Sequence, residues 1–190
     1  MTWQDHSVHC AFFQPYAEQE QFNNRLVLLL QQLLAKLKAQ TGQHAVAAKD
    51  IVYLILPEFS GPDNPQLNTL LQQLMRSCPG LLQSEQCRVF PYGSAGALMA
   101  LNAAQQALQQ QPATPIWLLG VDSLCNAGAF ADYKAADASY VLSEGAIALC
   151  ITAADCGLSL LFSGADALAC QSDQGEDSAA GALFRQVAQR

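Results

Sequence analysis

Charged residues are scarce in this chain, and the basic ones are scarcer than the acidic ones. Only 13% of its 190 residues are charged, and nine lysines and arginines stand against sixteen aspartates and glutamates, for a net charge of −7. Between Asp50 and Tyr133 the only basic residues are Arg76 and Arg88. Nucleic acids and anionic membranes are bound by fields of positive charge, so neither is expected as a partner. A broad docking surface for an acidic carrier protein would also be thin here.

Long apolar runs, a signal-peptide core and metal-binding cysteine pairs are missing as well. No stretch reaches the ~18 consecutive apolar residues of a transmembrane helix, and the polar start of the chain does not resemble a secretory signal. The seven cysteines are odd in number and include no Cys-x-x-Cys pair. His9 and Cys10 form a conceivable metal pair, but no further ligands follow at suitable spacing. We expect a cytoplasmic protein without metal or cofactor, whose cysteines are mostly small core residues.

The apolar residues that are present suffice for one substantial core, because they make up 51% of the chain. Continuous apolar runs alternate with segments of helical periodicity, which predicts buried strands between helices. We therefore predict a single α/β domain over residues 1–190. The expected strands cover 7–13, 51–56, 87–90, 116–121, 146–152 and 158–162, and the expected helices cover 19–40, 65–76 and 94–111, with a further helix from 179 and a helical turn within 126–137.

Local signals refine this prediction at two places. Asn64 followed by Pro65 is typical of a helix start, with the proline in the first turn. The connection Asp155-Cys156-Gly157 is short enough for an antiparallel hairpin between the last two strands. The hairpin would make the sheet mixed. The predicted fold is a three-layered α/β structure, a five-stranded mixed sheet flanked by helices on both faces.

The most informative segment is a strand-to-helix elbow, where an apolar run enters Gly93-Ser94-Ala95-Gly96 and an alanine-rich helix leaves it. Ser94 is expected at the helix N-terminus, where unpaired N–H groups and the positive end of the dipole favour an anion or a nucleophile. A serine at this place is equally an ordinary N-cap. Gly93 and Gly96 are expected to permit a tight turn and a close helix approach.

Three motifs, in order along the chain, carry a family resemblance. They are Gly93–Leu98 (GSAGAL) with its helix, Trp117–Ser123 (WLLGVDS), and Ser143–Leu149 (SEGAIAL). In sequence and spacing they resemble the nucleophile elbow, the strand ending in Gly-Gly-Val-Asp/Glu, and the Gly-Glu-Gly-Ala strand entry of the β-ketoacyl synthases. The chain thus resembles the N-terminal half of the thiolase-like fold over roughly residues 20–185.

The resemblance implies roles for several residues. It places Ser94 where the family has its nucleophilic cysteine, or Gly93 if the register shifts by one. It implies mainly structural roles for Asp122, which ends a strand near the elbow, for Glu144, which caps or hydrogen-bonds a neighbouring loop, and for Gly145, which allows close backbone packing. The family also uses two histidines, or a His–Asn pair, from its C-terminal half. The histidines here all precede the elbow and match no family motif: His6, His9 and His44.

Other interpretations of these residues stay open. Asp122 and Glu144 could act as paired carboxylates in acid–base work. A displaced thiol could serve as the nucleophile, and Cys125, just after the strand that contains Asp122, is better placed for this than Cys87 or Cys150. The run 87–92 could be an interface strand that pairs with its twofold mate across a dimer, where Pro91 would limit the pairing, or an ordinary internal strand.

We therefore expect a β-ketoacyl-synthase-like protein of fatty-acid or polyketide-type acyl metabolism that lacks a complete condensing site and acts as a non-catalytic or partner subunit. The alternative is an acyltransferase or condensing enzyme that uses Ser94, with the remaining groups on a separate C-terminal half. A third interpretation is an unrelated α/β domain that binds a small molecule. A lone half would expose an apolar helix face, so a homodimer or pairing with a second thiolase-like half is expected. Acyl-CoA or an acyl carrier protein is a candidate partner.

Overall fold

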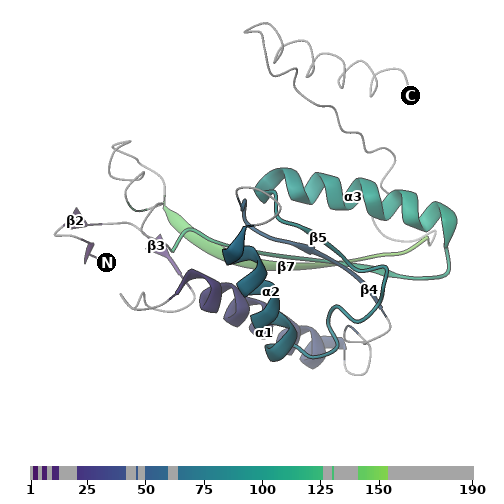
Figure 1. The fold of residues 1–190 in the computed structure, drawn as a ribbon, viewed down its shortest axis with the longest axis horizontal. Helices are drawn as coiled ribbons and strands as arrows, with labels where there is room; N and C mark the ends of the chain where they lie inside the picture. The colour runs from purple at the N-terminus through teal and green to yellow at the C-terminus, as the bar shows by residue number, and fades with distance from the viewer. Residues whose placement is uncertain are drawn as a thin grey trace, which may run out of the picture.

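A mixed β-sheet lies between helices on its two faces, as the computed structural model shows in Figure 1. The structure describes residues 2–3, 6–7, 10–12, 21–41, 46, 50–59, 64–125, 130 and 141–153. Helices α1 (Phe22–Thr41) and α2 (Pro65–Ser77) pack together on one face, and α3 (Gly93–Gln110) covers the other. The predicted α/β class with a mixed sheet is therefore confirmed.

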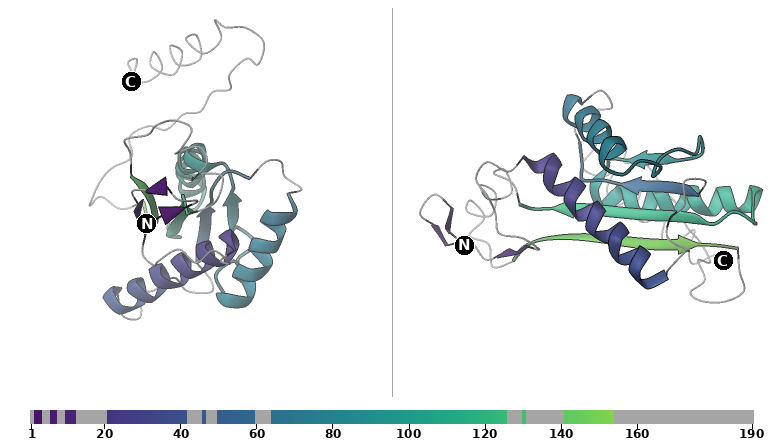
Figure 2. Two further views of the ribbon diagram at one scale, coloured as in Figure 1. Left: turned by 90° about the vertical axis from the view of Figure 1, so that its left-hand side faces the viewer. Right: turned by 90° about the horizontal axis from the view of Figure 1, so that it is seen from below.

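Four strands make up the body of the sheet, in the order β7-β6-β4-β5. Strands β4 (Ile51–Ile55), β5 (Arg88–Phe90) and β6 (Ile116–Ser123) run parallel, and β7 (Leu142–Ile151) runs antiparallel to β6. Figure 2 shows β7 along one side of the sheet, with α1 beneath it. The sheet is mixed because of the β6–β7 pair. Residues 158–162, the second strand of the predicted hairpin, lie outside the described residues.

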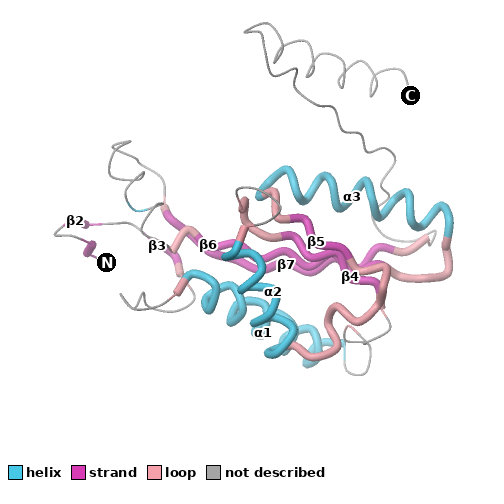
Figure 3. The backbone as a smooth tube through the Cα atoms, viewed as in Figure 1, coloured by secondary structure: helices cyan, strands magenta, loops and turns pink. Residues whose placement is uncertain are grey.

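Short strands precede this body. The two-residue strand β3 (Cys10–Ala11) pairs in parallel with the start of β7, and β1 (Thr2–Trp3) pairs with β2 (His6–Ser7) in a separate ladder (Figure 3). The prediction of one strand over residues 7–13 is therefore wrong, because the described pieces belong to two different sheets.

Alternating side chains of the strands divide the core into two clusters, as expected for strands buried on both faces. Toward α1 and α2, the leucines and valines of the sheet meet the apolar stripes of both helices. Toward α3, the partners are small, because Ala100 and Ala104 of the helix are fully buried. Helix α3 covers β4, β5 and β6, whereas α1 covers β6 and β7. The α3 side of β7 therefore exposes Ile147 and Leu149.

The predicted boundaries agree closely for the three helices and for β4, β5 and β6. Asn64 is the N-cap of α2 as predicted, since its side chain accepts a hydrogen bond from the Gln66 N–H at 2.8 Å and Pro65 occupies the first turn. Strand β7 begins at Leu142, four residues before the prediction. The turn within 126–137 (except Phe130) and the helix from 179 lie outside the described residues. No helix in the described ranges is long and apolar enough to span a membrane.

Candidate functional site

The elbow between β5 and α3 is held by backbone hydrogen bonds to the loop after β4. The Gly93 N–H donates to the Leu56 carbonyl at 3.1 Å, and the Phe59 N–H donates to the Pro91 carbonyl at 3.2 Å. Gly93 has a φ of 55°, a left-handed conformation that favours glycine. The predicted tight turn at Gly93 is therefore confirmed, and it fixes where α3 begins.

Gly96 provides the predicted close approach of α3 to the sheet. A Cβ built on Gly96 would lie 2.9 Å from the Phe90 carbonyl oxygen and 3.5 Å from Ile55 Cγ2. Any larger side chain would therefore push the first turn of α3 away from β5 and β4. By contrast, a Cβ on Gly145 would meet no atom within 4 Å. The prediction of close packing at Gly145 is thus wrong for the described chain, because α3 does not reach over β7.

Ser94 is exposed in the first turn of α3, as the second residue of the helix. The N-cap is Tyr92, which makes no side-chain capping hydrogen bond. The alternative that Ser94 caps the helix is therefore wrong, because the helix begins one residue before it. Within the described ranges the Ser94 hydroxyl has no hydrogen-bond partner. The elbow presents this hydroxyl to solvent and to the positive end of α3, and none of the described bases is hydrogen-bonded to it.

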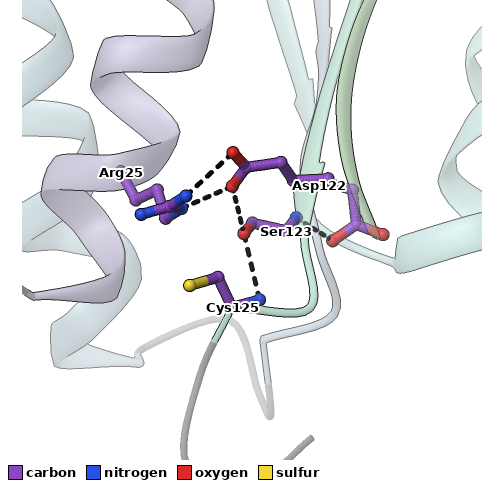
Figure 4. Close-up of polar contacts among 5 residues, drawn as sticks. Arg25, Asp122, Ser123 and Cys125 are labelled. Carbon is purple, nitrogen blue, oxygen red and sulfur yellow. Dashed lines mark hydrogen bonds and ion pairs between the residues drawn. The ribbon is translucent and has the colours of Figure 1, made fainter. Parts of the chain in front are cut away.

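A buried polar cluster lies at the same end of the strands as the elbow, on the face of the sheet that α1 covers (Figure 4). Arg25 of α1 forms a two-pronged ion pair with Glu144 of β7: its Nε donates to Oε2, and its Nη2 donates to Oε1 at 2.9 Å. The side chains of Arg25 and Glu144 are only 2% and 1% exposed. Two charges removed from water to this extent are tolerated only as a well-formed pair.

The cluster extends from the ion pair into the loop after β6. The Ser123 hydroxyl donates to Glu144 Oε2 at 3.0 Å and accepts from the Cys125 N–H at 3.1 Å. The ring of Phe12 lies under the guanidinium of Arg25, with 5.3 Å between Cζ and the ring centroid. Glu144 thus holds the end of β6 and the side of α1 together. This agrees with the structural role that the resemblance implied for it, although the main partner is a helix rather than a loop.

Asp122 and Glu144 do not form an acid–base pair. In the β6–β7 register Asp122 lies opposite Gly145, and Ser123 lies opposite Glu144. Because side chains alternate between the faces of a strand, Asp122 lies on the α3 side and Glu144 on the α1 side. The Asp122 carboxylate is exposed and accepts the N–H of Ser123 at 2.8 Å. The prediction that Asp122 ends a strand is confirmed to within one residue.

Arg25 was not predicted as a site residue, although the sequence contains a signal for it. An arginine three residues after Phe22 and four before Leu29 stands in the apolar stripe of its helix. A cation in such a stripe requires a buried anion nearby. The partner could not be identified without the β7 register, because Glu144 lies 119 residues further along the chain.

The thiols are poorly suited to act as nucleophiles. Cys125 is buried, and Cys87 is half-buried, where its Sγ accepts from the Val52 N–H at 3.3 Å. Cys150 is exposed on β7, but partial burial of its thiol, and secondly the negative charge of Asp50, raise its pKa. A raised pKa leaves less of the reactive thiolate at neutral pH. The described thiols therefore do not replace Ser94 at the elbow.

The described part of the chain contains one of the three histidines and no cluster of metal ligands. His6 lies in β2, and His9 and His44 fall outside the described residues. Across the described ranges no three His, Cys, Asp or Glu side chains gather as a metal site would require. No protein-family model and no curated protein matches the sequence.

Proposed function

We propose that this chain is a thiolase-like, β-ketoacyl-synthase-like protein of acyl metabolism that acts as a non-catalytic or partner subunit. The observation that carries the proposal is the elbow: an exposed Ser94 on the first turn of α3, to which no base in the described part of the chain is hydrogen-bonded. A serine hydroxyl at its ordinary pKa is a weak nucleophile and needs such a base. A serine in this position without a hydrogen-bonded base supports a partner subunit rather than a working condensing enzyme.

The remainder of the fold supports the same proposal. The three motifs of the resemblance lie on β6, β7 and the β5–α3 elbow, and each has one end at the same end of the sheet. The pairing of Glu144 with Arg25 gives the second carboxylate a purely structural task. Strand β5 lies at the edge of the sheet, where a second copy of the chain could continue it, and this supports the proposed homodimer.

The test is intact-mass spectrometry of the purified protein after incubation with a panel of acyl-CoA and acyl-carrier thioesters. We expect no adduct on any thioester. Ser94→Ala is compared with Ser77→Ala, since Ser77 is an exposed serine at the end of α2. An acyl adduct that is lost in Ser94→Ala but kept in Ser77→Ala would overturn the non-catalytic proposal. It would establish instead the alternative function, an acyltransferase whose remaining groups come from a separate half.

A further inference from the structure

A polar cleft opens at the end of the sheet opposite to the elbow. It has a volume of about 270 Å³ and lies between the C-terminal end of α3 and the beginnings of β4, β5 and β6. Figure 1 shows this end of α3 opposite to the turn where the helix starts. The polar side chains along its walls come from β4, β5, the turn before β5, and α3: Tyr53, Glu85, Gln86, Arg88, Gln110 and Gln111.

One wall of this cleft carries hydrogen-bond donors that are held in place. The Arg88 guanidinium stacks on the Tyr53 ring, with 5.7 Å between Cζ and the centroid, and Phe90 packs on the same ring with centroids 5.6 Å apart. Tyr53 is only 1% exposed, so its ring is a fixed platform. Stacking leaves the N–H edge of a guanidinium available for a planar anion. Neither Arg88 nor the Tyr53 hydroxyl has a hydrogen bond or ion pair to any residue that the structure describes.

Of these two donors without a partner, the Tyr53 hydroxyl is the stronger indication of a ligand, because a buried phenol usually has a hydrogen-bond partner. Among the described side chains, Gln73 Oε1 is the one fully buried nitrogen or oxygen atom without a partner. The Tyr53 hydroxyl is therefore not sealed from solvent, and the cleft that Tyr53 lines is its opening. Two donors of different type thus meet one small space without a protein acceptor.

The opposite side of the cleft carries one carboxylate and the C-terminal end of α3. Glu85 is exposed in the turn before β5, and its carboxylate makes no ion pair with Arg88 or another described residue. Helix α3 ends here without a basic residue in its last turn, so the negative end of its dipole is not compensated by the helix itself. An anion alone would be attracted to Arg88 and repelled by this side of the cleft. A ligand with both charges would satisfy both walls.

We propose that this cleft binds a small zwitterion of the α-amino-acid class. Its carboxylate accepts hydrogen bonds from Arg88 and from the Tyr53 hydroxyl, and its ammonium group lies toward Glu85 and the carbonyl end of α3. The amides of Gln86 and Gln111, which are 3.4 Å apart from Nε2 to Oε1, border the site. A cleft of this volume suits a molecule of a few heavy atoms rather than a folded partner. The proposal does not depend on the proposed function.

The test uses the full chain and ligand-observed NMR with four probes: alanine, leucine, propionate and ethylamine. We expect both amino acids to bind at millimolar concentration, and propionate and ethylamine to bind about tenfold more weakly or not at all. Arg88→Gln and Glu85→Gln should each weaken amino-acid binding by about tenfold, and Tyr53→Phe by several-fold. Arg76→Gln and Glu58→Gln remove the same charges from exposed positions outside the cleft and should leave binding unchanged.

Any of three results would overturn the proposal. Absence of saturable binding by either amino acid to the folded wild-type protein excludes the site. Equal binding of alanine and propionate shows that the ammonium group is not recognised, and equal binding to wild type and Arg88→Gln places the ligand elsewhere. Circular dichroism of each variant separates lost binding from lost folding. Because Arg88 and Glu85 are exposed, substituting them should change the stability of the fold little.

Discussion

The two faces of the sheet hold their helices by different means. On the α1 and α2 face, large aliphatic side chains interlock and a buried ion pair joins α1 to β7. On the α3 face, Gly96, Ala100 and Ala104 bring the helix backbone close to the strands, and no buried ion pair is present among the described residues. The first arrangement depends on volume and charge, and the second on the absence of side-chain atoms.

The two faces also differ in what they present to solvent. The α1 and α2 face is not closed, since open pockets of about 340 and 430 Å³ lie beside these helices. The α3 face carries the elbow with Ser94 and the cleft with Arg88, and it leaves apolar side chains exposed on α3 and β7, with Leu98 66% and Ile147 56% exposed. Three predictions test this contrast between the two faces.

The largest effect is expected from breaking the ion pair on the α1 side. Arg25→Met leaves the Glu144 carboxylate buried without its cation, which should lower the free energy of unfolding by about 3–5 kcal/mol. Urea denaturation followed by circular dichroism measures the loss. The double variant Arg25→Met with Glu144→Leu should recover most of it, because an apolar pair carries no desolvation penalty. A loss below about 1 kcal/mol for the single variant would show that the pair does not hold α1 to β7.

A smaller effect is expected on the α3 side from adding a single methyl group. Gly96→Ala should destabilise the protein by about 1–2 kcal/mol, because the Phe90 carbonyl oxygen at 2.9 Å belongs to the backbone and yields little, and this outweighs the gain in helix propensity. Gly145→Ala is the matched control, since its methyl group meets open space. Equal midpoints of urea unfolding for the two variants would show that the close approach of α3 to the sheet at Gly96 does not make this position sensitive to an added methyl group.

The smallest effect concerns the pH dependence of the α1 and α2 face. Burial raises the pKa of the Cys78 thiol above its ordinary value of 9.0, because the thiolate is disfavoured in the folded state. The stability that this confers is complete below the pKa of the unfolded chain and is lost as the pH rises through the folded pKa. The urea midpoint should therefore fall between neutral pH and about pH 10, and less steeply in Cys78→Ala. Cys150 is present in both the wild type and Cys78→Ala, so its contribution cancels in the difference between their pH profiles. Parallel pH profiles would contradict the prediction.

The sequence allowed most of the helices and central strands to be predicted because their signals are local. The leucine spacing of α1, the Asn64-Pro65 start of α2 and the apolar runs of β4 and β6 each depend on neighbours within a few residues. The tight turn at Gly93 and the close approach at Gly96 were predictable for the same reason, since both follow from the absence of a side chain.

The elements that were missed depend on distant partners. Strand β7 starts at Leu142, four residues before the prediction, and Glu144 near its start pairs with the distant Arg25. The separation of Asp122 from Glu144 depends on register, which one sequence does not contain. The cleft at Arg88 and Tyr53 joins four segments, and none of them contains a recognisable motif by itself.

The ion pair between Arg25 and Glu144 also has a consequence for the order of events during synthesis. The two partners are 119 residues apart, so translation at typical rates separates their appearance by on the order of ten seconds. During that interval Arg25 has no Glu144 to pair with. The ion pair that fixes α1 against β7 can therefore form only after residue 144 has been made, although α1 is translated before β4, β5, β6 and β7.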